Sequence, residues 1–175
     1  MVEPTPAAEP TYSPQAVHLI RTAIQANVML SQMADQKASM LMAATFVVFT
    51  IAVGQAGGPF TAALIVVAVF AFLSAICAIV AVLPAVQLPL DAKQPNLLFF
   101  GGYSHLSEEE FAARLLPLLT SDEQVFRTML RDLHQNGQVL ARKKYRFLGH
   151  AYRLFLAGLV IASAAVAYEY IRGFT

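Results

Sequence analysis

The densest group of basic side chains in the sequence is Arg142-Lys143-Lys144-Tyr145-Arg146, which shortly precedes an apolar segment beginning at Leu154. Arginine makes charge-assisted hydrogen bonds to phosphate oxygens, so this cluster could bind a phosphate-bearing ligand. Basic residues next to an apolar segment also anchor a helix to anionic lipid headgroups. From the cluster alone we favour lipid anchoring and keep the phosphate site as the alternative.

Side chains at two further places in the sequence could take part in binding or gating. Asp35 and Lys37 stand at the start of the first apolar segment, where a carboxylate needs a partner. An interfacial ion pair or a snorkelling lysine is the favoured interpretation, and a role in a pore or gate is the alternative. His105 follows the flexible stretch 101–104 and could contact a base or a phosphate, although an ordinary polar loop residue is favoured.

Catalytic and metal chemistry find little support. The four histidines are scattered without the close helical spacing of metal sites, and no phosphate loop, zincin motif or nucleophile elbow occurs. The lone cysteine, Cys77, lies in an apolar run and is expected to be structural. The net charge of +1 gives no argument for nucleic acid as a partner. We therefore expect neither an enzyme nor a metal protein.

Composition places the chain in a membrane. Hydrophobic residues make up 57% of the chain and charged residues only 13%, against roughly 25% in soluble domains. The 53 positions from 38 to 90 carry no Asp, Glu, Lys or Arg. A soluble fold cannot bury such a stretch, so we predict an all-α integral membrane protein with about three spans. Two of the three spanning helices should extend into a cytoplasmic helical domain.

Helix signals divide the chain further. Ser13-Pro14 resembles an N-cap followed by proline at the first helical position, and no proline or glycine follows until Gly54, so one helix of about 40 residues is expected. Gly57-Gly58-Pro59 should form a tight turn. The predicted division is a disordered tail (1–13), an amphipathic helix (14–37), the first span (38–58), the second span (60–83), a cytoplasmic helical domain (84–153) and the third span (154–171).

The predicted cytoplasmic domain begins with a proline-rich connector, from Pro84 to Asn96. Residues 97–103 could form an interfacial segment or a buried loop. Capping boxes at Ser107 and Ser121 each start a helix, the first yielding near Pro117. From the second cap, steps of three and four residues predict a seam that packs on residues 17–28, with a possible bend near Asn136-Gly137. The seam comprises Phe126, Leu130, Leu133, Gly137, Leu140, Lys144 and Phe147.

Orientation follows from the basic residues, which favour the cytoplasmic side of a membrane. Nine of the 12 lysines and arginines lie in residues 84–153, and none lies in the turn between the first two spans. We therefore expect the amino terminus and residues 84–153 in the cytoplasm and the carboxyl terminus outside.

Several segments, in order, resemble the transmembrane Pycsar effectors. Residues 26–44 resemble the start of these proteins, where an Asp-x-Lys-Ala tetrapeptide precedes the first span; here it is Asp35-Gln36-Lys37-Ala38. The resemblance covers roughly residues 15 to 170. The other matching segments are Phe99-Phe100-Gly101, Leu106 to Phe111, Asp132-Leu133 and Leu140 to Arg146.

This resemblance implies a bacterial anti-phage effector. In such systems a pyrimidine cyclase senses infection and makes cyclic UMP or cyclic CMP, and the effector then impairs the inner membrane. The resemblance assigns no nucleotide-binding residues. Our candidates for the phosphate are Arg131, Arg142, Lys143 and Arg146, and our candidates near the base are Tyr103, His105 and Tyr145.

Two hypotheses of different classes follow. The first is a ligand-gated effector, a homo-oligomer in contact with membrane lipids and without a resident cofactor, activated by a cyclic pyrimidine mononucleotide. The second is a membrane scaffold or lipid-binding protein without a nucleotide switch. A transporter or constitutive channel is less favoured, because the spans contain few polar residues and no charge away from the membrane interfaces, where Glu169 is expected to lie. A neighbouring cyclase gene would favour the first hypothesis.

Overall fold

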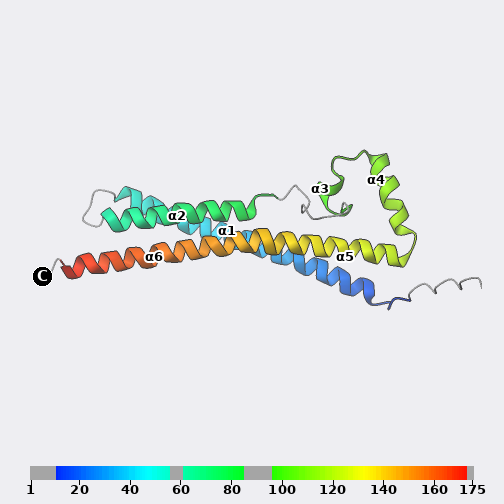
Figure 1. The fold of residues 1–175 in the computed structure, drawn as a ribbon, viewed down its shortest axis with the longest axis horizontal. Helices are drawn as coiled ribbons and strands as arrows, with labels where there is room; N and C mark the ends of the chain where they lie inside the picture. Colours follow the sequence, from blue (N-terminus) through cyan, green and yellow to red (C-terminus); the bar gives the residue numbers. More distant parts are fainter. Residues whose placement is uncertain (1–10, 56–60, 85–95, 173–175) are drawn as a thin grey trace, which may run out of the picture. The chain divides into compact units, whose positions relative to one another are not determined.

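The computed structural model describes residues 11–55, 61–84 and 96–172, and these residues are helical throughout apart from short turns. They form two compact units, one of residues 11–28 and 96–137, the other of residues 29–55, 61–84 and 138–172. Within the described residues, three helices are long and apolar enough to cross a membrane. This confirms the predicted all-α membrane fold with three spans (Figure 1).

Helix α1 (Ala16–Gly54) has 39 residues and belongs to both units. The Ser13 hydroxyl accepts from the Gln15 N–H at 3.3 Å, and the Ser13 carbonyl accepts from the Ala16 N–H. The long uninterrupted helix agrees with the absence of proline and glycine before Gly54. Helix α2 (Thr61–Val82) follows. The predicted turn at 57–59 and connector residues 85–95 lie outside the described residues, as does the tail up to residue 10.

The last three helical segments are continuous from residue 122 to residue 172. Helix α5 (Asp122–Val139) passes into a π-helix, Leu140–Tyr145, and then into α6 (Arg146–Arg172). α5 continues past Gly137, so the glycine does not end the helix. The irregularity begins at Leu140 instead, where the hydrogen bonds change to the wider i→i+5 pattern.

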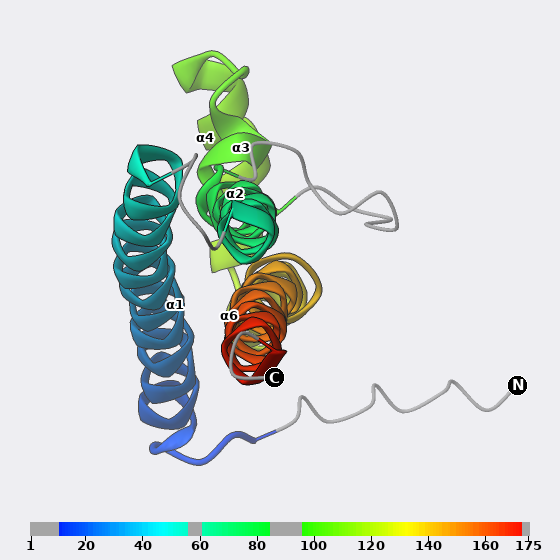
Figure 2. The same cartoon turned by 90° about the vertical axis from the view of Figure 1, so that its left-hand side faces the viewer.

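The second unit is built on close packing of α2 against α6, which run side by side (Figures 1 and 2). Its core consists mainly of alanines, with Ala38, Ala78 and Ala151 fully buried. The Ser74 hydroxyl, also fully buried, donates to the Ala151 carbonyl at 2.7 Å. Small side chains allow helix backbones to approach closely, and this is the usual way that helices associate in lipid.

Gly158 of α6 lies directly against Phe70 of α2. A Cβ atom added there would overlap the Cβ of Phe70 and would lie 3.0 Å from its Cγ. Since the Cβ of Phe70 is fixed by its own backbone, it cannot move away without moving α2. Glycine at this position therefore sets the distance between the two helices.

The first unit contains the short helices α3 (Phe100–Tyr103) and α4 (Glu108–Leu115), a 3₁₀ turn at Leu116–Leu119, most of α5 and the start of α1. Both halves of the predicted capping box at Ser107 are present. α4 ends just before Pro117, as expected. At Ser121 only the serine half forms, because the Gln124 side chain accepts from Thr120 instead.

One contact between α1 and the predicted seam on α5 is made by a polar group. Asn27 of α1 donates to the Leu133 carbonyl at 3.1 Å. A Cβ at Gly137 would lie 3.6 Å from the Asn27 amide nitrogen. The seam residue Leu130 is instead half exposed. A hydrogen bond to a backbone carbonyl takes the place of the expected apolar contact at this level.

Candidate functional site

The basic cluster forms the π-helix itself. Leu140–Tyr145 is a six-residue π-helix with Arg142, Lys143 and Lys144 in its last turn. π-helices are rare, and they occur frequently at functional sites because the wider turn redirects side chains. Here the two adjacent lysines contact two different helices. The π-helix is therefore the structural centre of the second unit's polar contacts.

Lys143 reaches the end of α2. Its ammonium donates to the Leu83 carbonyl at 2.9 Å, just after the last residue of the helix. The last carbonyls of a helix have no partner within the helix, and a cation there also interacts favourably with the helix dipole. Lys143 thus caps α2 from the π-helix.

Lys144 reaches α1 through three hydrogen bonds. Its ammonium lies 2.7 Å from both carboxylate oxygens of Asp35 and 2.7 Å from the Ser31 hydroxyl oxygen. The Lys144 side chain is 19% exposed and that of Asp35 is 44% exposed. An ammonium group has three protons, so all its donors are used. This contact is the ion pair that the position of Asp35 led us to expect, and its partner is 109 residues away in the sequence.

Two tyrosine hydroxyls make weaker contacts with the same stretch of α1. The Tyr145 hydroxyl donates to the Leu30 carbonyl and the Tyr152 hydroxyl to the Lys37 carbonyl, each at 3.4 Å. These distances are long for O–H···O bonds, so their contribution is small. Together with Lys144, residues 30–37 of α1 thus accept hydrogen bonds from three side chains on or near the π-helix.

The residues of the Asp-x-Lys-Ala tetrapeptide lie in three different environments. Asp35 pairs with Lys144, whereas Ala38 is fully buried in the alanine core. Lys37 is exposed. One helical turn therefore places a charge toward the π-helix and a small apolar side chain toward the helix core. The i, i+3 spacing puts both on neighbouring positions of one face.

The candidate nucleotide-binding residues divide between the two units. Those in the first unit are exposed or partly exposed, and Tyr103 stacks on Phe111 with ring centroids 5.0 Å apart. In the second unit, Arg142 and Arg146 are exposed on the π-helix and at the start of α6. The first unit holds Tyr103, His105 and Arg131, and the second holds Arg142, Lys143, Tyr145 and Arg146.

A buried polar network in the first unit was missed by sequence reasoning. Asn96 is 1% exposed and Asp132 is 7% exposed, and the Asn96 amide donates to the Asp132 carboxylate at 2.8 Å. Asn136 donates to the same oxygen at 2.8 Å, and the Asn96 side-chain oxygen accepts from the Leu98 N–H. A Cβ at Gly102 would overlap the Asn96 carbonyl oxygen. The network fixes the Asn96 segment on α5.

An ion pair lies on the surface of the first unit. Arg127 and Glu123 form an i, i+4 ion pair at 2.6 Å, with the arginine side chain 72% exposed. The hydrogen bond that Arg127 donates to the Glu123 carboxylate, and then the negative charge of that carboxylate, raise the pKa of Arg127 above its ordinary value. Among the residues that the structure describes, no group of three His, Cys, Asp or Glu side chains could hold a metal ion.

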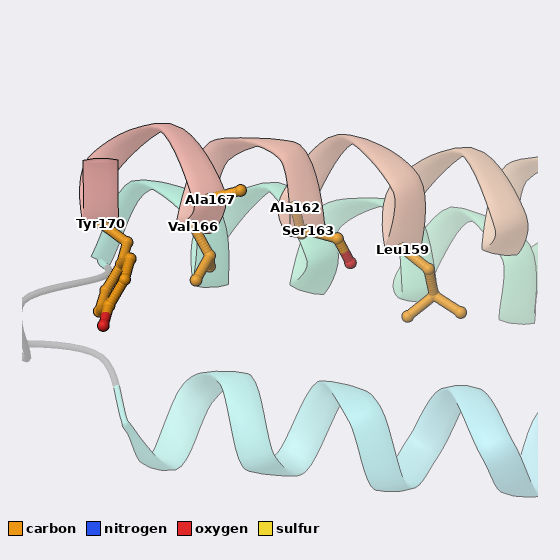
Figure 3. A pocket seen from close by; sticks show the side chains of 6 residues that line it. All are labelled: Leu159, Ala162, Ser163, Val166, Ala167 and Tyr170. Atoms are coloured by element: carbon orange, nitrogen blue, oxygen red, sulfur yellow. The ribbon is translucent and has the colours of Figure 1, made fainter. Parts of the chain in front are cut away.

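The α6 helix also borders an apolar groove in the second unit. The groove has a volume of about 450 Å³, and Figure 3 shows Leu159, Val166 and Tyr170 directed from α6 toward α1. It is lined by Leu159, Ala162, Ser163, Val166, Ala167 and Tyr170. Its lining contains no charged group, so it offers nothing to a phosphate-bearing ligand.

Comparison with known proteins identifies the family. Residues 18–170 match the family model PycTM, described as the Pycsar effector protein domain. No curated protein and no solved structure matches the chain. The match includes the Asp35 tetrapeptide, the Asn96 network and the whole π-helix. The family consists of membrane effectors that are typically not catalysts. The chain, with its three potential spans, therefore belongs to the Pycsar effector transmembrane family, which implies that it is a membrane effector of anti-phage defence.

Proposed function

We propose that this protein senses a cyclic pyrimidine mononucleotide, cyclic UMP or cyclic CMP, made by a partner cyclase during phage infection. Binding makes a homo-oligomer in the bacterial inner membrane impair that membrane, and the infected cell stops growing or dies. The family match over residues 18–170 is the observation that carries this proposal. The three long apolar helices are consistent with it.

The proposed topology follows from the distribution of basic residues. The amino terminus and residues 84–153 lie in the cytoplasm, where a cyclase product would be available. In this topology the basic π-helix and the Asn96 network lie on the cytoplasmic side of the membrane. A soluble nucleotide can reach them without entering the bilayer.

The proposed phosphate site is the exposed basic surface formed by Arg142 and Arg146, with Lys143 beside it. A phosphate binding Lys143 would compete with the Leu83 carbonyl, which now accepts from that lysine at 2.9 Å. Ligand binding would thereby weaken the cap on α2. A ligand shifts a conformational equilibrium only if it binds one state better than the other. Because the phosphate and the Leu83 carbonyl compete for Lys143, the ligand would bind the state without the cap more tightly than the state with it.

Residues for the base are proposed on chemical grounds. Tyr145 offers an aromatic ring next to the basic surface, and its hydroxyl bond to Leu30 is long enough to be given up at little cost. Tyr103 and His105 are exposed in the first unit, where they could stack on a base. Arg131 is the remaining candidate for the phosphate.

The direct test is nucleotide binding by the purified full chain in detergent, measured by isothermal titration with cyclic UMP, cyclic CMP and, for specificity, cyclic AMP. We expect one cyclic pyrimidine nucleotide to bind and cyclic AMP to bind more weakly. The double variant Arg142→Ala/Arg146→Ala should lose binding by at least about tenfold, since charge-assisted bonds to phosphate contribute roughly 1.5–3 kcal/mol each. Arg127→Ala, which removes an exposed arginine that pairs with Glu123, is the matched control.

Unchanged binding in the double variant would show that the phosphate site is elsewhere. Unchanged nucleotide-dependent growth arrest in the same variant would lead to the same conclusion. A chain that binds no cyclic nucleotide would favour the second function, a scaffold that binds anionic lipid through the exposed side chains of Arg142 and Arg146. Vesicles with and without anionic lipid, mixed with the same two variants, would test that function.

A further inference from the structure

The contacts of the π-helix connect all three helices of the second unit at one level. Lys143 binds the end of α2, Lys144 binds Asp35 and Ser31 on α1, and the π-helix itself leads directly into α6. In an α-helix, adjacent residues point about 100° apart, since 3.6 residues make one turn. The wider π turn changes this register for every residue that follows it. The register of α6 is thus set where the lysines bind.

A six-residue π-helix needs support from its surroundings. π-helices are rare and usually occur as single turns inside α-helices. Here the supporting contacts come from the side chains of the π-helix itself, above all the bidentate contact of Lys144 with Asp35 at 2.7 Å. If these contacts are lost, the segment can relax to α-helical hydrogen bonding. Because one residue corresponds to about 100°, that change would rotate α6 relative to α5.

We propose that the Lys144–Asp35–Ser31 contact is a latch that holds the π-helix, and with it α1, in the resting arrangement, and that its release activates the protein. The two-state element is the π-helix, which changes hydrogen-bond register when the latch opens. This inference rests on the proposed membrane-impairing function. It does not depend on which nucleotide is recognised or on where it binds.

The composition of the latch suits a reversible contact. The Asp35 side chain is 44% exposed, so water can replace the lysine once the contact opens. A fully buried ion pair would resist opening, since separating it leaves uncompensated charge in a low dielectric. An entirely exposed pair would contribute almost nothing to the resting state. This pair lies between the two extremes, and the Ser31 hydroxyl satisfies the third proton of the ammonium.

The test measures membrane potential and colony counts in bacteria that express the full chain without any cyclase. Asp35→Asn and Lys144→Met should each depolarise the membrane and reduce colony counts by about tenfold or more, because each removes charge-assisted bonds. The exchanged pair Asp35→Lys/Lys144→Asp preserves the two charges and their combined length, and it should restore the silent state. Glu109→Gln, which neutralises an exposed carboxylate on α4, is the control and should stay silent.

Other outcomes overturn the latch. The latch is contradicted if the single variants reach the membrane in normal amounts and stay silent, whether or not they still respond to a cyclase. It is also contradicted if the exchanged pair is as toxic as the single variants. If either single variant fails to accumulate, Ser31→Ala decides, since it removes one hydrogen bond without changing charge and should lower the amount of nucleotide needed for arrest. The wild-type protein, tested with a cyclase, separates the two proposals. If it does not respond to the nucleotide, the proposed function is contradicted. The latch is still tested by whether the single variants depolarise the membrane without a cyclase.

Discussion

Replacing Gly158 with alanine should weaken the packing of α2 on α6. The added Cβ would overlap the Cβ of Phe70, an atom that cannot turn away because it is attached directly to the backbone. The helices would have to separate by a fraction of an ångström, and the alanine core between them would loosen. The buried bond from Ser74 to the Ala151 carbonyl, at 2.7 Å, lies in the same interface and would lengthen.

The matched control is Gly149→Ala on the same helix. Nothing lies within 4 Å of a Cβ at Gly149, so this change introduces no overlap. Both substitutions gain roughly 0.5–1 kcal/mol because alanine favours helix over glycine, and this gain cancels in the comparison. The remaining difference is the cost of overpacking, about 1–3 kcal/mol. In a chain of 175 residues, each kcal/mol shifts the melting temperature by roughly 2–4 °C.

The assay is thermal denaturation in detergent micelles with a fluorogenic dye that reacts with a thiol. Cys77 is the single cysteine and packs against the core of the second unit, so the dye reports opening of that core. We expect Gly158→Ala to melt several degrees below Gly149→Ala. Equal melting temperatures would refute the reasoning, because they would show that α2 and α6 can separate at no measurable cost.

Three smaller effects can be measured on the first unit. Asn96→Ala should destabilise it by about 1–3 kcal/mol, because it leaves the buried Asp132 carboxylate with one donor fewer; hydrogen exchange at residues 96–103 should accelerate, and unchanged protection would contradict this. Ser107→Ala should cost about 1 kcal/mol and increase exchange in the first turn of α4, whereas Ser107→Asp should retain the cap. Arg127→Ala should change stability by less than about 0.5 kcal/mol, since its pair with Glu123 is exposed; a larger loss would mean that the pair belongs to a network.

Local signals in the sequence predicted the helices well. The Ser107 capping box, the long helix without proline or glycine after Pro14, and the end of α4 before Pro117 each depend on residues close together in the chain. The apolar spans are equally local, since their composition alone requires a membrane. The order of family segments around the spans then identified the family, which the match over residues 18–170 confirms.

Contacts between distant residues could not be predicted in this way. Asp35 was expected to find a partner, but its partner Lys144 is 109 residues away. The predicted seam included Lys144 but was expected to pack on residues 17–28, so it did not indicate Asp35 as the partner. The π-helix has no sequence pattern of its own, so the irregularity was expected at Gly137, where glycine weakens a helix. The buried Asn96–Asp132 pair likewise joins residues 36 positions apart. The nucleotide site stays a prediction for the same reason.

The most direct test of the account is the membrane potential of living bacteria that express this protein, measured with and without an inducible cyclase that makes cyclic UMP or cyclic CMP. The account predicts rapid depolarisation followed by growth arrest with one of the two nucleotides and no change without a cyclase. An unchanged membrane potential with both nucleotides, at normal levels of protein in the membrane, would contradict it.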